Sequence, residues 1–287
     1  MNYKEFCDYV EKNILEFVPT ECGNRNVEIN EVVKNNGKVK KGISLLPEKA
    51  TMAPVIYLDD AFERYKSGGD IKAIMDDIVG VILNAEKAKN FPDLFDFEAV
   101  KDIIGFELVN FNRNKERLKD NVWEPVEDLA KVYRVFFIDD SSLSAAMIPN
   151  ELLRCWEITR DELDVLAASN MEKMLPPVLY DIEESIRCGL SSEPENLLEK
   201  ESLGARNKML ILTNAHKSMG AASALYPGVL EKVREMMGDD LTIIPSSTEE
   251  VIIVPKSCPM PPKEIGNMVR EVNRHMSQED ILSDRVY

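Results

Sequence analysis

Residues 208–255 constrain the fold of this chain more than any other stretch of the sequence. They contain three apolar runs rich in β-branched residues, at Met209–Thr213, Leu241–Ile244 and Val251–Val254. Short runs of this kind, bounded by turn-forming residues, are typical of β-strands. Between the first run and the second, residues 228–237 have the apolar spacing of a helix. We therefore predict one compact unit in which a sheet that includes the three strands buries alternate residues against that helix.

The remaining sequence mixes helical and strand patterns without regular alternation. Helical spacing runs from Tyr3 to Phe17, and Asn35-Asn36-Gly37 is typical of a hairpin turn. Asp70 is a suitable N-cap for a helix, and Thr159 with Glu162 forms a capping box at the start of another. Such an order of elements favours an α+β fold with mixed, largely antiparallel sheets and packed helices.

The residue pattern of the sequence changes near residue 122, where strongly apolar strand patterns become frequent. We therefore divide the chain into an N-terminal α+β region, residues 1–121, and a C-terminal α+β region, residues 122–287. The second region carries the unit predicted between residues 208 and 255.

The charge of the chain argues against polyanionic partners. With 51 acidic and 35 basic residues among 287, the formal net charge is −16. Such a field repels nucleic-acid phosphates and anionic lipid surfaces. Two local basic clusters are interpreted as solvated faces, because short charge runs are usually exposed turns or helix surfaces. They are Lys34, Lys38, Lys40 and Lys41, and Arg113, Lys115, Arg117 and Lys119.

The N-terminal residues and the cysteines of the sequence favour a cytoplasmic location. The first residues, Met1–Lys12, carry acids and no apolar run, so no secretory signal is visible. No segment approaches the roughly 20 apolar residues that span a bilayer. The cysteines are scattered and odd in number, which favours reduced thiols; they are Cys7, Cys22, Cys155, Cys188 and Cys258. We expect a cytoplasmic chain that does not bind membranes.

Several segments of the second region resemble one known family. They read ILTN at 211–214, GAA at 220–222, LYPGVLE at 225–231 and IIPSSTEEVIIVP at 243–255, preceded by VYRVFFID at 132–139. In this order they resemble the domain of unknown function 5688 family, a bacterial family. The resemblance supports the α+β interpretation. It implies no activity, cofactor or partner, and it carries over no functional residues.

Complete catalytic or metal-binding motifs are absent from the sequence. The two histidines, His216 and His275, stand in no HExxH pattern, and the cysteines form no CxxC pair. Cys155 lacks a local protease signature, and Ser246-Ser247 lacks the GxSxG elbow that exposes a hydrolase serine. We expect no metal and no cofactor, and we interpret the serine pair as turn residues whose hydroxyls bond nearby backbone.

The loop from Asn214 to Gly220 is the best candidate for a functional site. It follows an apolar strand and combines an amide, an imidazole, an ammonium, a hydroxyl and a glycine, and loops at strand ends concentrate function. With the neighbouring turn, the candidate binding residues are Asn214, His216, Lys217, Gly220, Ser246 and Ser247. The structural alternative is that Gly220-Ala221-Ala222 only lets a helix pack closely on the sheet.

Taken together, these features favour a non-catalytic module that binds another protein or regulates it. The 13 methionines, some on predicted helix faces, suit an adaptable apolar groove, although core filling explains them equally well. The alternative is an enzyme, such as a hydrolase, whose site is assembled around residues 214–220 with an acid from elsewhere. A polar pocket holding these residues favours the enzyme, and an exposed apolar patch favours the binding module.

We predict that nucleic acid does not bind this chain appreciably at physiological salt, because the net charge of −16 repels phosphate. A gel-shift assay with single- and double-stranded probes checks this. Sub-micromolar affinity that weakens steeply with added salt would show that a basic cluster overrides the net charge.

Overall fold

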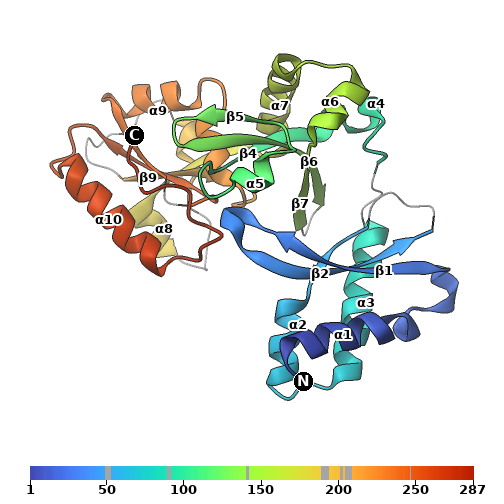
Figure 1. Ribbon diagram of the computed structural model, residues 1–287. Helices are drawn as coiled ribbons and strands as arrows, with labels where there is room; N and C mark the ends of the chain where they lie inside the picture. The colour runs from blue at the N-terminus through green and yellow to red at the C-terminus, as the bar shows by residue number, and fades with distance from the viewer. Residues whose placement is uncertain are drawn as a thin grey trace. The chain divides into compact units, whose positions relative to one another are not determined.

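The structure is a computed structural model that describes residues 1–48, 53–88, 92–139, 142–188, 194–200, 203, 209–245 and 247–287. Residue contacts divide it into two compact units, Met1–Asp93 and Leu94–Tyr287 (Figure 1). The fold is α+β, and every strand pair in the described residues is antiparallel. The boundary between the two regions near residue 122, which rests on the change of residue pattern in the sequence, stays a prediction.

The first unit packs helices against a small sheet. Its elements are α1 Tyr3–Asn13, β1 Arg25–Val33, β2 Val39–Pro47, β3 Ile56–Tyr57, α2 Leu58–Lys66 and α3 Ile71–Ala88, with strand order β1-β2-β3. The predicted hairpin is confirmed: Asn36 and Gly37 take positive φ angles of 57° and 75° at its tip. Fully buried side chains of the helices and of β2 form one core, among them Phe6, Ile43 and Leu58.

The second unit begins with a four-stranded sheet. The strands and helices of this first part of the unit are α4 Phe97–Val100, β4 Ile104–Asn110, α5 Lys115–Leu118, β5 Trp123–Val126, β6 Leu129–Asp139, β7 Ser142–Met147, α6 Asn150–Trp156 and α7 Arg160–Met174. The long strand β6 pairs with β4, β5 and β7. The predicted capping box of Thr159 and Glu162 opens α7. Asn170 on α7 donates to the backbone oxygen of Ile104 at 2.9 Å, which ties the helix to β4.

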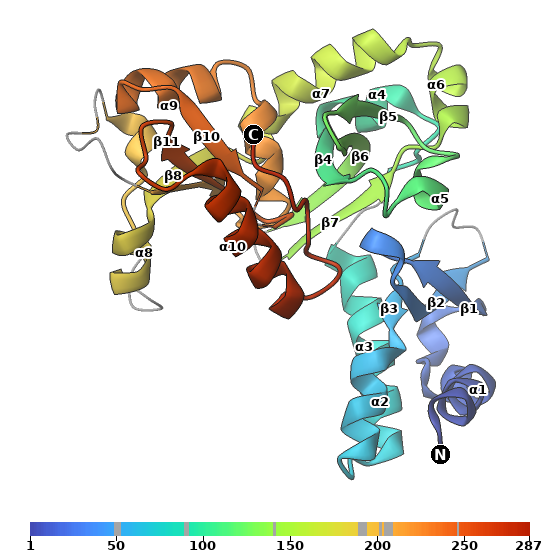
Figure 2. The same cartoon turned by 60° about the vertical axis from the view of Figure 1, so that its left-hand side comes forward.

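A second four-stranded sheet follows in the same unit, and it is the one predicted from residues 208–255. The strands and helices of this part of the chain are β8 Pro177–Asp181, α8 Ile182–Cys188, β9 Leu210–Asn214, α9 Val229–Met237, β10 Leu241–Ile244, β11 Val251–Pro255 and α10 Pro262–His275. The strand order is β10-β11-β9-β8. Figure 2 labels β8, β10 and β11 of this sheet together with α10. Ile243 pairs with Ile253, and Ile252 pairs with Ile244 and Ile211. The predicted hairpin and sheet are therefore confirmed.

The two faces of this second sheet have different environments. Residues directly opposite in antiparallel strands point to the same side, so the register assigns each residue to a face. Leu210, Leu212, Val251 and Ile253 share one face, and each is at most 2% exposed. On this core face, Ile243 and Val251 line an apolar cavity together with Leu230 of the predicted helix, α9.

The opposite face is covered in part by α10. Ile244, Ile252 and Val254 lie on this face, and they pack in one cluster with Ile265 and Val269 of α10. The spacing of Ile265, Val269 and Val272 in the sequence is typical of a helix, but it gives no indication that this helix covers the sheet.

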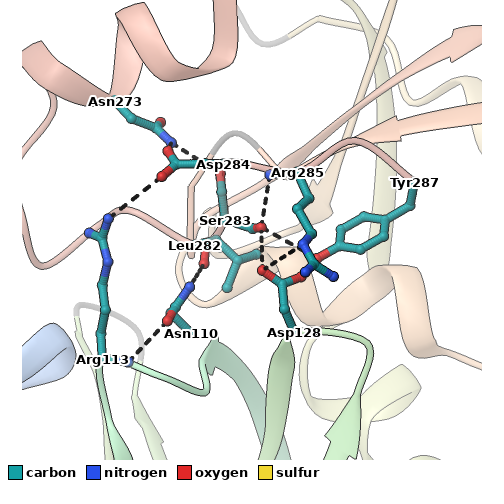
Figure 3. A network of polar contacts seen from close by, with 9 residues as sticks. All are labelled: Asn110, Arg113, Asp128, Asn273, Leu282, Ser283, Asp284, Arg285 and Tyr287. Atoms are coloured by element: carbon teal, nitrogen blue, oxygen red, sulfur yellow. Dashed lines mark hydrogen bonds and ion pairs between the residues drawn. The ribbon is translucent and has the colours of Figure 1, made fainter. Parts of the chain in front are cut away.

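The last residues of the chain tie α10 to the rest of the second unit (Figure 3). Asn273 on α10 donates to the backbone oxygen of Ser283 at 3.0 Å and to the Asp284 carboxylate at 2.7 Å. Asn110, at the end of β4, donates to the backbone oxygen of Leu282 at 2.9 Å. The position of α10 on the sheet is thus fixed through residues 282–284.

Asp128, in the turn between β5 and β6, anchors the same segment. Its carboxylate accepts hydrogen bonds from the Ser283 hydroxyl at 2.8 Å and from the Tyr287 hydroxyl. Burial raises the pKa of the Tyr287 phenol, so this hydroxyl stays protonated and donates. Tyr287 also exchanges two backbone hydrogen bonds with Ile243, at 2.7 and 2.9 Å, along the free edge of β10.

We predict that Asp128→Ala lowers the free energy of unfolding by roughly 1.5–3 kcal/mol, because two hydroxyl groups lose a charged acceptor. Asp128→Asn, which keeps an acceptor oxygen of similar shape, should cost less. Thermal unfolding of the parent protein and of the two variants measures the order of their stabilities. An Asp128→Ala protein that melts with the parent would show that Asp128 does not anchor the tail.

Candidate functional site

Asn214 builds the loop that the sequence singles out. Its side chain is fully buried; the amide donates to the backbone oxygen of Ser218 at 2.8 Å, and its oxygen accepts from the backbone N–H of His216 at 3.0 Å. The backbone N–H of Lys217 donates to the backbone oxygen of Asn214 at 2.9 Å. All of these bonds close the loop on itself, so the role that the structure gives Asn214 is to shape it.

Gly220 allows a close approach between the loop and the sheet. A Cβ atom at this position would lie 2.0 Å from the Thr213 hydroxyl oxygen and 2.3 Å from the backbone oxygen of Glu249. Thr213 donates to that same backbone oxygen at 2.7 Å, so neither neighbour has room to move. The close backbone approach expected at Gly220 is therefore present, and it serves packing.

The turn after β10 is stabilised by its own polar groups. Ser247 is 9% exposed, and its hydroxyl accepts from the backbone N–H of Glu249 at 3.1 Å. The backbone N–H of Ser247 donates to the backbone oxygen of Glu250 at 3.2 Å. These bonds match the turn role predicted for Ser247. Ser246 lies outside the described residues.

His216 and Lys217 lie at the exposed tip of the loop. Lys217 has a positive φ of 52°, and its ammonium lies 5.8 Å from the centroid of the Tyr180 ring. Lys217 also lines a hollow beside the loop, whereas the residues that line this hollow do not include His216. Of these two adjacent residues, which the sequence places in one candidate site, only Lys217 therefore belongs to the hollow.

The hollow has a volume of about 200 Å³ and mixed chemistry. Tyr180, Ile211 and Pro194 give it apolar walls, and Glu249 and Glu250 give it carboxyl groups. The Glu249 carboxylate accepts from the backbone N–H of Met219 at 2.9 Å and is used within the fold. Because both carboxyl groups are partly buried, loss of solvation raises the pKa of Glu249 and of Glu250.

An apolar groove lies on the same face of the sheet, between α10 and the strands. Its volume is about 170 Å³, and apart from Asn273 its lining is apolar or sulfur-bearing. Four lining side chains are well exposed: Met209 at 40%, Met260 at 37%, and Met268 and Val272 at 54% each. The methionines in the sequence suggest an adaptable apolar groove, but they do not indicate where it lies. The signal available in the sequence is that Met268 and Val272 lie to one side of the buried stripe of Ile265 and Val269.

The described part of the chain shows neither a metal cluster nor a membrane-spanning helix. No group of three or more His, Cys, Asp or Glu side chains in that part is placed to hold a metal ion. None of its helices combines the length and the apolar character needed to cross a bilayer. All five cysteines lie in it as free thiols.

Comparison with known proteins places the chain in a family. A family model described as a family of unknown function, DUF5688, matches residues 3–287. The chain belongs to this family, as its sequence motifs indicate. No curated protein and no solved structure matches it.

We predict that replacing His216 and Lys217 together by alanine leaves the melting temperature nearly unchanged, since exposed substitutions usually cost no more than about 0.5 kcal/mol. Gly220→Ala should instead destabilise by roughly 1–3 kcal/mol, because the added methyl group overlaps Thr213 and Glu249. Thermal unfolding of both variants makes the comparison. A marked loss of stability in the double variant would show that His216 or Lys217 is structural.

Proposed function

We propose that this protein binds another protein through the apolar groove between α10 and strands β10 and β11, and that it does so without catalysis. The observation that carries the proposal is the exposure of Met209, Met260, Met268 and Val272 around one groove. Soluble proteins seldom leave such apolar side chains together in water unless the patch is covered by a ligand or partner. Methionine adapts its shape to a partner, as in other grooves that receive apolar helices.

Charge indicates the kind of partner. On the helical wheel of α10, Glu264 and Glu271 lie beyond Met268 and Val272, whereas Arg270 lies on the opposite flank. Arg274 forms an ion pair with Glu271 at 2.5 Å, but both side chains are exposed, and exposed ion pairs contribute little free energy. The net charge of −16 adds a long-range attraction for cations. The occupant that we propose is an amphipathic helix with basic residues beside its apolar anchors.

The geometry of the hollow gives little support to the hydrolase alternative. Of the groups considered for that site, Lys217 lines the hollow, but the Asn214 amide is engaged within the loop and His216 lies outside the lining. The hydroxyls of Thr213 and Ser185 in the lining each donate to a backbone oxygen, at 2.7 and 3.0 Å. A hydroxyl nucleophile has to direct its proton at a base, so binding is the function that the geometry favours.

We predict that a fluorescent helical peptide of leucine and lysine binds the protein, and that Met268→Glu weakens this binding about tenfold or more, because a charge replaces an apolar contact. Fluorescence anisotropy measures the dissociation constant. A peptide with glutamate in place of lysine should bind more weakly, because the charge of the protein repels it.

Asn267→Glu is the matched control. It adds the same negative charge to an exposed position on the back of α10, opposite the buried stripe of Ile265 and Val269 and outside the groove lining. If attraction by net charge alone held the peptide, both substitutions would preserve or strengthen binding. Equal affinity of the Met268→Glu and Asn267→Glu proteins would therefore contradict the proposal.

A further inference from the structure

The hollow beside the 214–220 loop has room for a small molecule and lies apart from the apolar groove. An apolar cavity of about 150 Å³ holds benzene, so the volume of about 200 Å³ found here suits a ligand of similar or slightly larger size. Its walls combine the ring of Tyr180, which is 7% exposed, with the aliphatic side chain of Ile211. A short hydrocarbon chain can pack against these walls.

Glu250 supplies the charge that a ligand in this hollow would meet. Glu249, the other acid of the lining, already accepts the backbone N–H of Met219. The Glu250 carboxyl makes neither a hydrogen bond nor an ion pair with any residue that the structure describes. Its pKa is raised by burial alone. A partly buried carboxylate in this situation gains free energy when a cation joins it.

The face of the Tyr180 ring already attracts a cation. The ammonium of Lys217 lies 5.8 Å from the centroid of this ring, within the range of a cation–π contact. Lys217 reaches this position from an exposed loop, so its side chain competes with any other cation that enters the hollow. The contact indicates which charge the aromatic wall accepts.

We propose that the hollow binds the ammonium group of a primary alkylamine, with Glu250 as its counter-ion and with Tyr180 and Ile211 against its alkyl chain. The amine can be a free small molecule or the side chain of a lysine in a peptide, because both present the same group on the same kind of stem. The site is distinct from the groove proposed for protein binding, since the two sets of lining residues do not overlap.

Two probes test this inference by calorimetry or NMR titration with the full chain: n-butylammonium and lysine capped at both its amino and carboxyl ends. 1-Butanol, which is neutral and of similar shape, serves as the reference ligand. We expect at least one of the two amines to bind and butanol not to bind measurably. Tighter binding of the capped lysine would assign the site to a protein side chain, and tighter binding of butylammonium would assign it to a free amine; both results support the site.

Three variants distinguish a specific site from general attraction to an acidic protein. Glu250→Gln should weaken amine binding about tenfold, whereas Glu231→Gln, which removes the same charge from the exposed surface of α9, should leave it unchanged. Lys217→Met should strengthen binding, because it removes the competing ammonium. Because glutamine has the shape of glutamate and carries no charge that burial would disfavour, the Glu250→Gln protein should fold, and its melting curve verifies this. Equal affinity of the Glu250→Gln and Glu231→Gln proteins, or no binding of either amine, would overturn the proposal.

Discussion

The structure depends on how one helix covers one face of a four-stranded sheet. Neighbouring strands lie about 4.8 Å apart and a helix with its side chains is about 10 Å across, so a single helix covers about two strands. In the second unit α10 packs on Ile244, Ile252 and Val254 of β10 and β11. The rest of this face carries Ile211 and Thr213 of β9 and Tyr180 of β8, which line the polar hollow instead. Both candidate sites therefore arise from the same incomplete coverage: one along the side of α10 and one beyond it.

The opposite face and the tail explain why this arrangement is stable. Leu210, Leu212 and Ile253 are completely buried on the core face, so the sheet does not depend on α10 for most of its apolar burial. The position of α10 is fixed at its far end by the bonds from Asn273 to residues 283 and 284, and Asp128 anchors the tail that follows. A helix held in this way can keep an apolar side open without collapsing further onto the sheet. This combination of a fixed frame and an adaptable methionine lining suits a binding surface.

The sequence predicted the local features and the sheet of β9, β10 and β11, but not the contacts that form the two sites. The hairpin at Asn36, the capping box at Thr159 and the pairing of β10 with β11 follow from residues that are close together in the chain, and all three are confirmed. Asn214 and Gly220 were recognised as unusual, but their roles depend on Ser218 and on Glu249, and the second of these contacts joins distant segments. Glu250 was not among the candidate site residues, because the strand residues that line the hollow with it, Tyr180 of β8 and Ile211 of β9, are distant in the sequence. The methionines suggested an apolar groove but not its place, because the pattern of α10 does not reveal which sheet the helix will cover.

The central claim is that the uncovered side of α10 is a binding surface. Methionine methyl groups report on it directly, because Met209, Met260 and Met268 line the groove, whereas Met75 and Met171 are completely buried in the cores of the two units. In a protein with isotope-labelled methionine methyl groups, titration with the leucine and lysine peptide should shift the three groove signals together. The Met75 and Met171 signals should stay in place. Shifts spread evenly over all methionines, or groove signals that do not move while the peptide binds, would contradict the account.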